Sequence, residues 1–480
     1  MHITDQSKER AFMYRIIVVA VVALIAATAP LRAQGLFVTT TDFATGSTAF
    51  LAPDAAEAEV NLLGIHADAS GYYHDGRIYV VNRLGQDNIL VLDAMDLRTP
   101  LNQFSVGNGA NPHDIEVVAP DKAYVSRYDG TALLVVNPEN GDSLSEIDLS
   151  AFADADGLPE VSQIVRVGDR LYLSCQRLDR NGGWGPADQS FLIVVDIAAD
   201  AVIDVDPAAA GVQGITLSST NPNGLAVVGD QIVVSVVAGF GDRAGGVEIV
   251  DTRSNRSLGL VVSEEDLGGD ITGMVVVSAS RGYAIVSDEN FTNSVKPFDL
   301  LTGAVGAPLQ NISDGYIPSL ATDGARLIVA DRGSFDNPDA AGLKIYDAAG
   351  GDFIAGPINT GLPPSAIVVM GDVAIATAVA AEGAQALPGE FALGAGYPNP
   401  FNAAVQIPFA VAAEAHVVLG VFDVLGREVR TLVAGRMAPG QYAVAWDGRD
   451  NASRTVGNGT YLVRLSGGGR SATSKVMLLK

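Results

Sequence analysis

Short apolar runs separated by Gly, Asp, Asn and Pro recur through the first four fifths of the chain. Six segments share one plan: a polar loop, an apolar strand, a Gly/Asp turn, a second apolar strand, a variable loop, and a third strand ending in Asp or Asn. Their second and third strands are expected at 78–82 with 89–93, 123–126 with 134–137, 171–174 with 191–196, 232–235 with 247–251, 284–287 with 295–299, and 327–330 with 343–347. The period of about 47 residues predicts β-propeller blades.

A seventh repeat is incomplete at the end of this region. It supplies apolar runs only at 366–370 and 373–378, whereas residues 36–41 and 47–51 near the N-terminus offer two unassigned strands. Pairing the two ends would close the ring and remove the exposed sheet edges of an open array. We therefore expect a seven-bladed propeller over 34–379, closed by the N-terminal strands.

The last ninety residues follow a different pattern. Short alternating or apolar runs at 405–410, 417–421, 441–446 and 461–465 are separated by Gly, Asn and Asp. This pattern predicts a small β-sandwich over 391–480, with Trp446 in its core. An Ala-rich stretch predicts a linker at 380–390. The expected fold class is all-β: a seven-bladed β-propeller followed by a small Ig-like β-sandwich.

The C-terminal motifs resemble those of a known secretion module. They are Tyr-Pro-Asn-Pro-Phe-Asn at 397–402, Val-Phe-Asp-Val-Leu-Gly-Arg-Glu-Val at 421–429, Trp-Asp-Gly-Arg-Asp at 446–450, and the terminal strand at 475–480. The series is similar to the C-terminal sorting domain of the type IX secretion route, which resembles the Ig-like domain of flagellar hook-capping proteins. The resemblance implies delivery by export machinery. The alternative is a plain stability domain or spacer, and Ala403 and Ala404 depart from the family's usual continuation.

The first two blades resemble a repeat family. Ile-Tyr-Val-Val-Asn-Arg at 78–83, followed by Asn-Ile-Leu-Val-Leu-Asp at 88–93, is similar to the YVTN repeat propellers. That class implies surface-layer or binding proteins, and related propellers include lactonases and dehydrogenases. Architecture follows from this resemblance, but the reaction does not.

The N-terminus has the layout of a secretory signal. Arg15 precedes an apolar run at 16–29, and small residues end at Ala33. We expect a signal peptide over 1–33, with Met13 as an alternative start, and no transmembrane anchor in the mature form. The expected location is extracellular or on the outer cell surface, after export through the periplasm.

Charge and cysteine content narrow the function classes. The formal net charge of −25 opposes binding to nucleic acid or to an anionic membrane. Cys175 is the single cysteine, so no internal disulfide forms, and its apolar strand predicts a buried, inert thiol.

Propeller geometry predicts one polar rim around the channel mouth. Loops entering the innermost strands carry Ser70, His113, Asp114, Ser162, Gln163, Asn223, Thr272, Ser319 and Ser365, and loops leaving the second strands carry Arg83, Arg127, Gln176, Arg177, Asp288, Glu289, Asp331 and Arg332. The four arginines follow equivalent strands, so they are expected either to grip an anionic ligand or to form salt bridges that join blades.

His113 is the strongest single candidate for chemistry, because a carboxylate lies beside it in the chain. We favour a structural role, in which His113 is a turn residue that forms a hydrogen bond with the neighbouring blade. Trp184 lies on the longest insertion. If exposed, it could stack on a sugar or a protein partner; the alternative is a tryptophan folded back over the blade.

Two functions remain open from the sequence. The preferred one is a binding module for a small anionic molecule, a glycan or a protein. The alternative is a calcium-dependent lactonase- or esterase-like hydrolase at the channel mouth. Calcium ligands for it would come from Glu160, Asn223, Asp114 and Asp270; no other cofactor is expected.

Overall fold

The computed structural model describes residues 34–371 and, in the C-terminal part, 392–394, 396, 399, 401, 405–411, 415–424, 426–437, 440–451, 454–467 and 470–479. The predicted signal peptide at 1–33, the predicted strand at 373–378 and the predicted linker at 380–390 lie outside the described residues. The domain boundaries at 33, 379 and 390 therefore stay predictions. No helix in the described part of the chain is long and apolar enough to cross a membrane.

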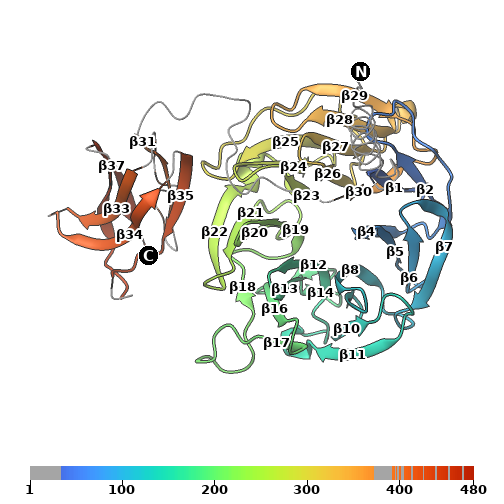
Figure 1. Cartoon of the computed structure of the whole chain (residues 1–480), viewed down its shortest axis with the longest axis horizontal. Helices are drawn as coiled ribbons and strands as arrows, with labels where there is room; N and C mark the ends of the chain where they lie inside the picture. The colour runs from blue at the N-terminus through green and yellow to red at the C-terminus, as the bar shows by residue number, and fades with distance from the viewer. Residues whose placement is uncertain are drawn as a thin grey trace, which may run out of the picture.

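Seven antiparallel sheets follow one another around a ring, each with one strand facing the centre (Figure 1). From the inside outward, blade 1 has β4 (Ala69–His74), β5 (Arg77–Asn82), β6 (Asn88–Asp93) and β7 (Asp96–Ser105); blade 2 has β8 (Pro112–Ala119), β9 (Lys122–Arg127), β10 (Ala132–Val136) and β11 (Ser143–Asp148). Blade 3 has β12 (Val161–Val167), β13 (Arg170–Cys175), β16 (Phe191–Asp196) and β17 (Ala201–Val202), with β18 (Ile215–Thr216) also beside β16 and a hairpin of β14 (Leu178–Asp179) and β15 (Gly185–Pro186) in its insertion.

The remaining blades repeat this arrangement. Blade 4 has β19 (Pro222–Val228), β20 (Gln231–Val236), β21 (Gly246–Asp251) and β22 (Arg256–Ser263); blade 5 has β23 (Asp270–Val276), β24 (Arg281–Ser287) and β25 (Asn293–Asp299); blade 6 has β26 (Ser319–Thr322), β27 (Arg326–Asp331), β28 (Gly342–Asp347) and β29 (Phe353–Ile358). Blade 7 has β30 (Pro364–Met370), β1 (Gly35–Thr41), β2 (Gly46–Leu51) and β3 (Gly64–Ile65). Helical turns occur only in connections of the described chain: η2 (Ser150–Phe152), α2 (Glu264–Leu267) and η3 (Pro338–Ala340).

Blade 7 closes the ring by joining the two ends of the propeller sequence. β1 pairs with β30 along most of its length, and β30 contacts β4 of blade 1. The hydrophobic pattern predicted two strands from each end, and this division is wrong. One strand of the described sheet comes from the C-terminal side and three from the N-terminal side, because β1 occupies the place beside β30.

The core consists of apolar layers between neighbouring blades. Each of the seven blade-to-blade contacts holds its own buried cluster. Phe37 and Phe50 of blade 7, for example, pack against Ile78 and Val80 of blade 1. Second and third strands bury both faces in this way, which is why they read as unbroken apolar runs. Cys175 is fully buried in one of these layers, as predicted, and burial raises the pKa of its thiol.

Antiparallel blades place two sets of loops on one face of the propeller. A loop from the second to the third strand of a blade emerges on the same side as the connection into the next blade's first strand, whereas the turn from first to second strand emerges on the opposite side. We call the first side the rim face. All of the predicted site residues lie on it or at the strand ends that meet it.

The C-terminal part is a two-sheet sandwich. One sheet contains β31 (Ala392–Leu393), β32 (Val405–Val411) and β35 (Gly440–Trp446); the other contains β34 (Glu428–Met437), β33 (Ala415–Asp423), β36 (Gly459–Gly467) and β37 (Arg470–Leu478). Alternate residues of β32 are buried, and Trp446 is only 1% exposed between Phe401 and Tyr461. The four strand positions and the core tryptophan match the sequence prediction.

Candidate functional site

Five innermost strands have a β-bulge at their rim-face end. Register shifts leave these residues without a pairing partner on the second strand: His113 in β8, Ser162 and Gln163 in β12, Asn223 in β19, Thr272 in β23, and Ser365 in β30. A bulge turns side chains away from the regular alternation. The repeat register thus brings six of the predicted inner-strand residues to equivalent bulges, whereas Ser70 and Ser319 pair regularly with the second strand.

Hydroxyl groups of the second strands hold these bulges. Ser126 Oγ accepts the backbone N–H of Asp114 at 2.9 Å and donates to the carbonyl oxygen of Ser162 in the next blade at 2.5 Å. Thr39 Oγ1 of blade 7 likewise accepts the N–H of Ala366 at 3.0 Å and donates to a carbonyl of blade 1. One hydroxyl therefore satisfies a displaced backbone group and joins two blades.

Three of the predicted site side chains also bridge blades. Asp114 Oδ2 accepts the N–H of Ile164 at 2.9 Å, and Gln163 Oε1 accepts that of Leu225 at 2.8 Å. Asn223 Nδ2 donates to the carbonyl oxygen of Ile271 at 3.0 Å. Burial raises the pKa of Asp114 to about 7, although the N–H groups of Ile164 and Ile115 oppose that shift. The side chains of Asp114, Gln163 and Asn223 therefore form hydrogen bonds with other parts of the propeller.

His113 has both ring nitrogens engaged. Arg83 Nη2 donates to Nε2 at 2.8 Å, and Nδ1 lies 2.9 Å from Ser162 Oγ. Because a guanidinium only donates, Nε2 carries the lone pair and Nδ1–H donates to Ser162. Removal from water, then the charges of Arg83 and Arg180, lowers the pKa of His113 to about 2. This neutral imidazole has no nitrogen left for a proton transfer or a metal, in line with the structural reading.

Aromatic and cationic side chains stack outward from His113. Its ring lies parallel to Tyr128, with 4.1 Å between ring centroids. The Arg180 guanidinium then lies over Tyr128 at 5.5 Å and over Trp184 at 4.9 Å. Arg180 also bonds Glu160, whose side chain is fully buried, at 2.9 Å. We call His113, Tyr128, Glu160, Arg180 and Trp184 the stacked cluster.

The four predicted arginines, Arg83, Arg127, Arg177 and Arg332, do not present free guanidiniums. Arg127 pairs with Glu146 of its own blade at 2.7 Å. Arg177 donates to a backbone carbonyl of its own insertion at 2.8 Å. Arg332 donates to the carbonyl of Thr41 in blade 7 at 2.9 Å, and its ring contact is to a phenylalanine of that loop. Arg83 and Arg332 thus join neighbouring blades, whereas Arg127 and Arg177 are held within their own blades, so the four do not form one anion-binding cluster.

The predicted acidic residues of the second set differ in exposure. Asp331 is fully buried, pairs with Lys344 at 2.7 Å and accepts the N–H of Ser313. Asp288 lies in an open turn, where the N–H groups of Thr292 and Asn290 lower the pKa of its carboxyl. Glu289, the next residue, is exposed, so Asp288 and Glu289 are the predicted acids that remain available to a partner.

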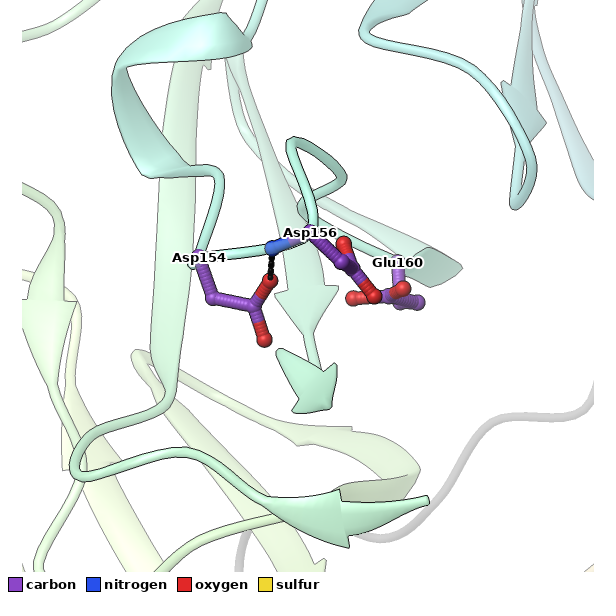
Figure 2. A group of neighbouring side chains, drawn as sticks. All are labelled: Asp154, Asp156 and Glu160. Atoms are coloured by element: carbon purple, nitrogen blue, oxygen red, sulfur yellow. Dashed lines mark hydrogen bonds between the residues drawn. The ribbon is translucent and has the colours of Figure 1, made fainter. Parts of the chain in front are cut away.

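The residues predicted as calcium ligands bond to separate parts of the propeller. Asp114 and Asn223 bridge blades as described, and Asp270 pairs with Arg243 at 3.3 Å. The one group of three acids with close carboxylate oxygens among the described residues is Asp154, Asp156 and Glu160, within 4.8 Å of one another (Figure 2).

That acidic group is itself engaged by the protein. Arg180 donates its backbone N–H to Asp156 and its side chain to Glu160. Burial raises the pKa of Glu160 to about 7, and the hydrogen bond from Arg180 opposes the rise. The positive charge beside these three acids is therefore the guanidinium of Arg180.

A ring of apolar side chains is the most prominent feature of the rim face. The loop between second and third strands carries one large apolar or aromatic residue in each of the seven blades: Phe43, Leu84, Tyr128, Trp184, Phe240, Phe291 and Phe335. All but Tyr128 are at least 54% exposed, and Phe335 is completely exposed. We call these seven the apolar ring.

Four members of the apolar ring also have unfavourable backbone conformations. Phe43, Leu84, Trp184 and Phe291 have φ values of 69°, 41°, 67° and 60°. A left-handed conformation costs a non-glycine residue about 1–2 kcal/mol. The fold gains little burial in return, because these side chains stay 54–76% exposed.

The hydrophobic pattern missed Tyr128, Arg180 and most of the apolar ring. Arg180 lies in the insertion of blade 3, where no repeat register indicates its position. The ring had a visible signal: one large apolar residue in each otherwise polar loop, at the same place in the repeat.

Comparisons with known proteins agree with this architecture. Residues 401–470 match the family model described as FlgD Ig-like domain. No curated protein matches the chain. Similar solved structures include Kuenenia stuttgartiensis hydrazine synthase, at 16% identity, covering 63% of this chain and 89% of that one with a TM-score of 0.48.

Two further similar structures are bacterial. PorZ, a surface component of the type IX secretion system of Porphyromonas gingivalis, is 13% identical and covers 91% of this chain and 63% of that one, with a TM-score of 0.43. BamB from Moraxella catarrhalis is 12% identical and covers 62% and 79%, with a TM-score of 0.39. The chain is a β-propeller followed by an Ig-like domain of the FlgD type.

Proposed function

We propose that this chain is a secreted or cell-surface binding module whose propeller captures a partner through its rim face. The apolar ring carries the proposal. Soluble proteins rarely gather large exposed apolar side chains on one face unless the face binds something. Here the exposed residues recur at one position of the repeat, several in strained backbone. Strain of this kind gathers at binding sites.

The polar groups of the channel mouth support binding over hydrolysis. A hydrolase needs a free base or a metal-activated water near its substrate. His113 donates and accepts within the protein, and Asp114 accepts two backbone N–H groups. We therefore keep the calcium-dependent hydrolase as the weaker alternative: the acids Asp154, Asp156 and Glu160 favour it, but Arg180 already bonds two of them.

Delivery to the surface is the second half of the proposal. The signal-like N-terminus and the FlgD-type domain support a type IX sorting role, and the blade motifs support a YVTN-type propeller. Within the sandwich, Asn399 joins the opening motif to the terminal strand. Its Nδ2 donates to the carbonyl of Lys475 at 2.9 Å, and its Oδ1 accepts the N–H of Met477 at 2.8 Å. A receptor would meet the opening motif and the terminal strand side by side.

Export is tested by truncation in a bacterium that has the type IX machinery. The full chain is compared with a chain lacking 391–480, and an antibody against the propeller measures each in the medium, at the surface and in the periplasm. We expect the truncated chain to stay in the periplasm. A full-length His416→Ser variant, changed at an exposed side chain outside the motifs that resemble the sorting domain, is the matched control. Equal export of the truncated chain would contradict the sorting role.

Binding is tested with a variant of the apolar ring. Phe43→Ser/Phe291→Ser/Phe335→Ser removes three exposed rings, and retention of the purified chain on cells is measured. The matched control replaces three exposed apolar residues of outer strands: Leu101→Ser/Leu144→Ser/Ile354→Ser. We expect the ring variant to lose retention and the outer-strand variant to keep it. Equal retention by both would remove the rim face from the proposal.

A further inference from the structure

Aromatic and acidic side chains gather on the rim face of blades 4 to 6. The aromatic residues are Phe240, Phe291, Tyr316 and Phe335, which are 66%, 76%, 53% and 102% exposed. The acidic residues in the same loops are Asp242, Asp288, Glu289, Asp314, Asp336 and Asp339. We call these ten residues the acidic aromatic sector.

Hydrogen bonds hold the loops of this sector together. Asn293 Nδ2 donates to the carbonyls of Phe291 at 3.3 Å and Gly315 at 3.1 Å, which joins the loops of blades 5 and 6. The N–H of Arg332 donates to the carbonyl of Tyr316 at 3.2 Å. On the other side, the carboxylate of Asp270 accepts the N–H of Gly241 from the loop of blade 4 at 3.0 Å. The three blades therefore present one connected surface.

The negative charge of this surface is only partly compensated, by Arg243 near Asp288. None of its six acids forms a salt bridge in the described structure. The nearby cations are engaged elsewhere: Arg243 pairs with Asp270, and Arg332 donates to the carbonyl of Thr41. Backbone N–H groups lower the pKa of Asp288, so this carboxylate is ionised at neutral pH.

Elsewhere on the rim face, guanidinium groups of the chain itself lie over exposed aromatic rings. The Arg332 guanidinium lies 4.2 Å from the ring centroid of Phe43, and that of Arg180 lies 4.9 Å from that of Trp184. No cation lies over Phe240, Phe291 or Phe335 in the described structure. Their own carboxylate neighbours raise the local concentration of cations, and aromatic faces attract cations directly.

We propose that the acidic aromatic sector binds an arginine- or lysine-rich segment of a partner protein. This inference rests on the proposed binding function and specifies its partner. Cationic side chains lie over Phe240, Phe291 and Phe335 as Arg332 lies over Phe43, and the surrounding carboxylates take the remaining charge. Charge complementarity selects this occupant, because a polyanion or an acidic protein is repelled by the same loops.

Fluorescence anisotropy with the full chain tests the proposal. The probe is a labelled peptide in which arginine and glycine alternate, and its control has glutamine in place of arginine. The first variant, Phe291→Ala/Phe335→Ala, leaves the net charge unchanged and is expected to weaken binding about fivefold, the effect of two exposed cation–π contacts. The second, Glu289→Gln/Asp314→Asn/Asp336→Asn, is expected to weaken binding about tenfold.

A charge-matched variant separates this site from general attraction. Asp75→Asn/Asp121→Asn/Asp169→Asn removes three exposed carboxylates from turns on the opposite face, where none forms a salt bridge. We expect it to change binding less than twofold, at the level of non-specific screening. Equal losses in the two charge variants, or no loss in the phenylalanine variant, would overturn the proposal.

Three other results would each have a defined meaning. Binding of a neutral oligosaccharide that disappears in the phenylalanine variant, with no arginine-peptide binding, would identify a glycan site and overturn the cationic partner. Loss of cell retention in the ring variant together with unchanged peptide binding in the sector variants would overturn this inference alone. Failure of export or retention with intact, sector-dependent peptide binding would overturn the proposed function alone.

Discussion

The rim face has a closed side in blades 1 to 3 and an open side in blades 4 to 6. Both sides place aromatic and acidic residues in the same loops of the same repeat. On the closed side, Arg180 covers Tyr128 and Trp184 and neutralises Glu160. On the open side, Phe291 and Phe335 have no cation over their rings, and the adjacent acids have no salt-bridge partner among the described residues.

An insertion explains the difference between the two sides. Arg180 and Trp184 lie in the turn between β14 and β15, a hairpin that only blade 3 has in the described propeller. In blades 2 and 3 the chain thus places its own guanidinium over the aromatic rings of the rim face. In blades 4 to 6 no cation of the described chain lies over Phe240, Phe291 or Phe335. One repeat can therefore produce a structural cluster and a binding surface, according to whether the cation comes from within the chain.

Removing the internal cation should strongly destabilise the protein. Arg180→Ala leaves the fully buried Glu160 without its partner, and we expect a loss of about 3 kcal/mol. Urea unfolding measures it. Arg180→Ala/Glu160→Gln should recover much of the loss, because a neutral amide tolerates burial better. Arg253→Ala, at an exposed pair with Asp230, is the control and should cost less than about 0.5 kcal/mol. Equal losses at both arginines would contradict the closed-side description.

His113 should contribute stability that fades in acid. Its pKa is about 2 in the fold and near 6.5 when unfolded, so below pH 6.5 the unfolded chain binds more protons. The contribution is therefore complete above pH 6.5 and is lost as the pH falls toward 2. His113→Ala should cost about 2 kcal/mol at pH 7, from two hydrogen bonds and the ring contact with Tyr128.

Two measurements check the role of His113. The penalty of His113→Ala in urea unfolding should shrink as the pH falls from 7 to 5. Nitrogen NMR should show a neutral imidazole protonated at Nδ1 throughout this range. An imidazole that titrates near pH 6.5 would refute the proposed hydrogen bonds to Arg83 and Ser162.

Asp114 should have the opposite pH dependence, although it adjoins His113. Burial raises its pKa to about 7 from an ordinary value of 3.8. Its contribution is complete below pH 3.8 and is lost as the pH rises toward 7, because the folded state then binds more protons than the unfolded state. Relative to Asp114→Asn, the wild type should lose up to about 3 kcal/mol between pH 4 and 7. A flat difference in unfolding free energy over this interval would show that the carboxylate stays ionised in the fold.

The two sides were unequally predictable from the sequence. Second strands such as β5 bury both faces and read as unbroken apolar runs, so the blades could be counted. The register of the repeat then placed His113 and Asn223 at equivalent bulges. β3 spans only Gly64–Ile65, too short for any periodicity, so the division of blade 7 was predicted wrongly.

Contacts that leave the repeat were not predictable. Arg180 acts from an insertion whose position no pattern specifies, and its partners Tyr128 and Glu160 are separated from it by 52 and 20 residues. The open side depends less on such contacts. Its exposed rings lie at one repeated loop position, which an alignment of the blades against one another would reveal.

The smallest effect on stability is expected on the open side. Phe335 is fully exposed, so Phe335→Ala removes no buried area and should change the free energy of unfolding by less than about 0.5 kcal/mol. Tyr128→Ala, at the equivalent loop of blade 2, should cost about 3 kcal/mol because that ring is 93% buried between His113 and Arg180, with an exposed fraction of 7%. Paired urea titrations of the two variants measure the contrast. A large loss from Phe335→Ala would mean that its ring packs within the protein in solution, and the open side would then be closed by the chain itself.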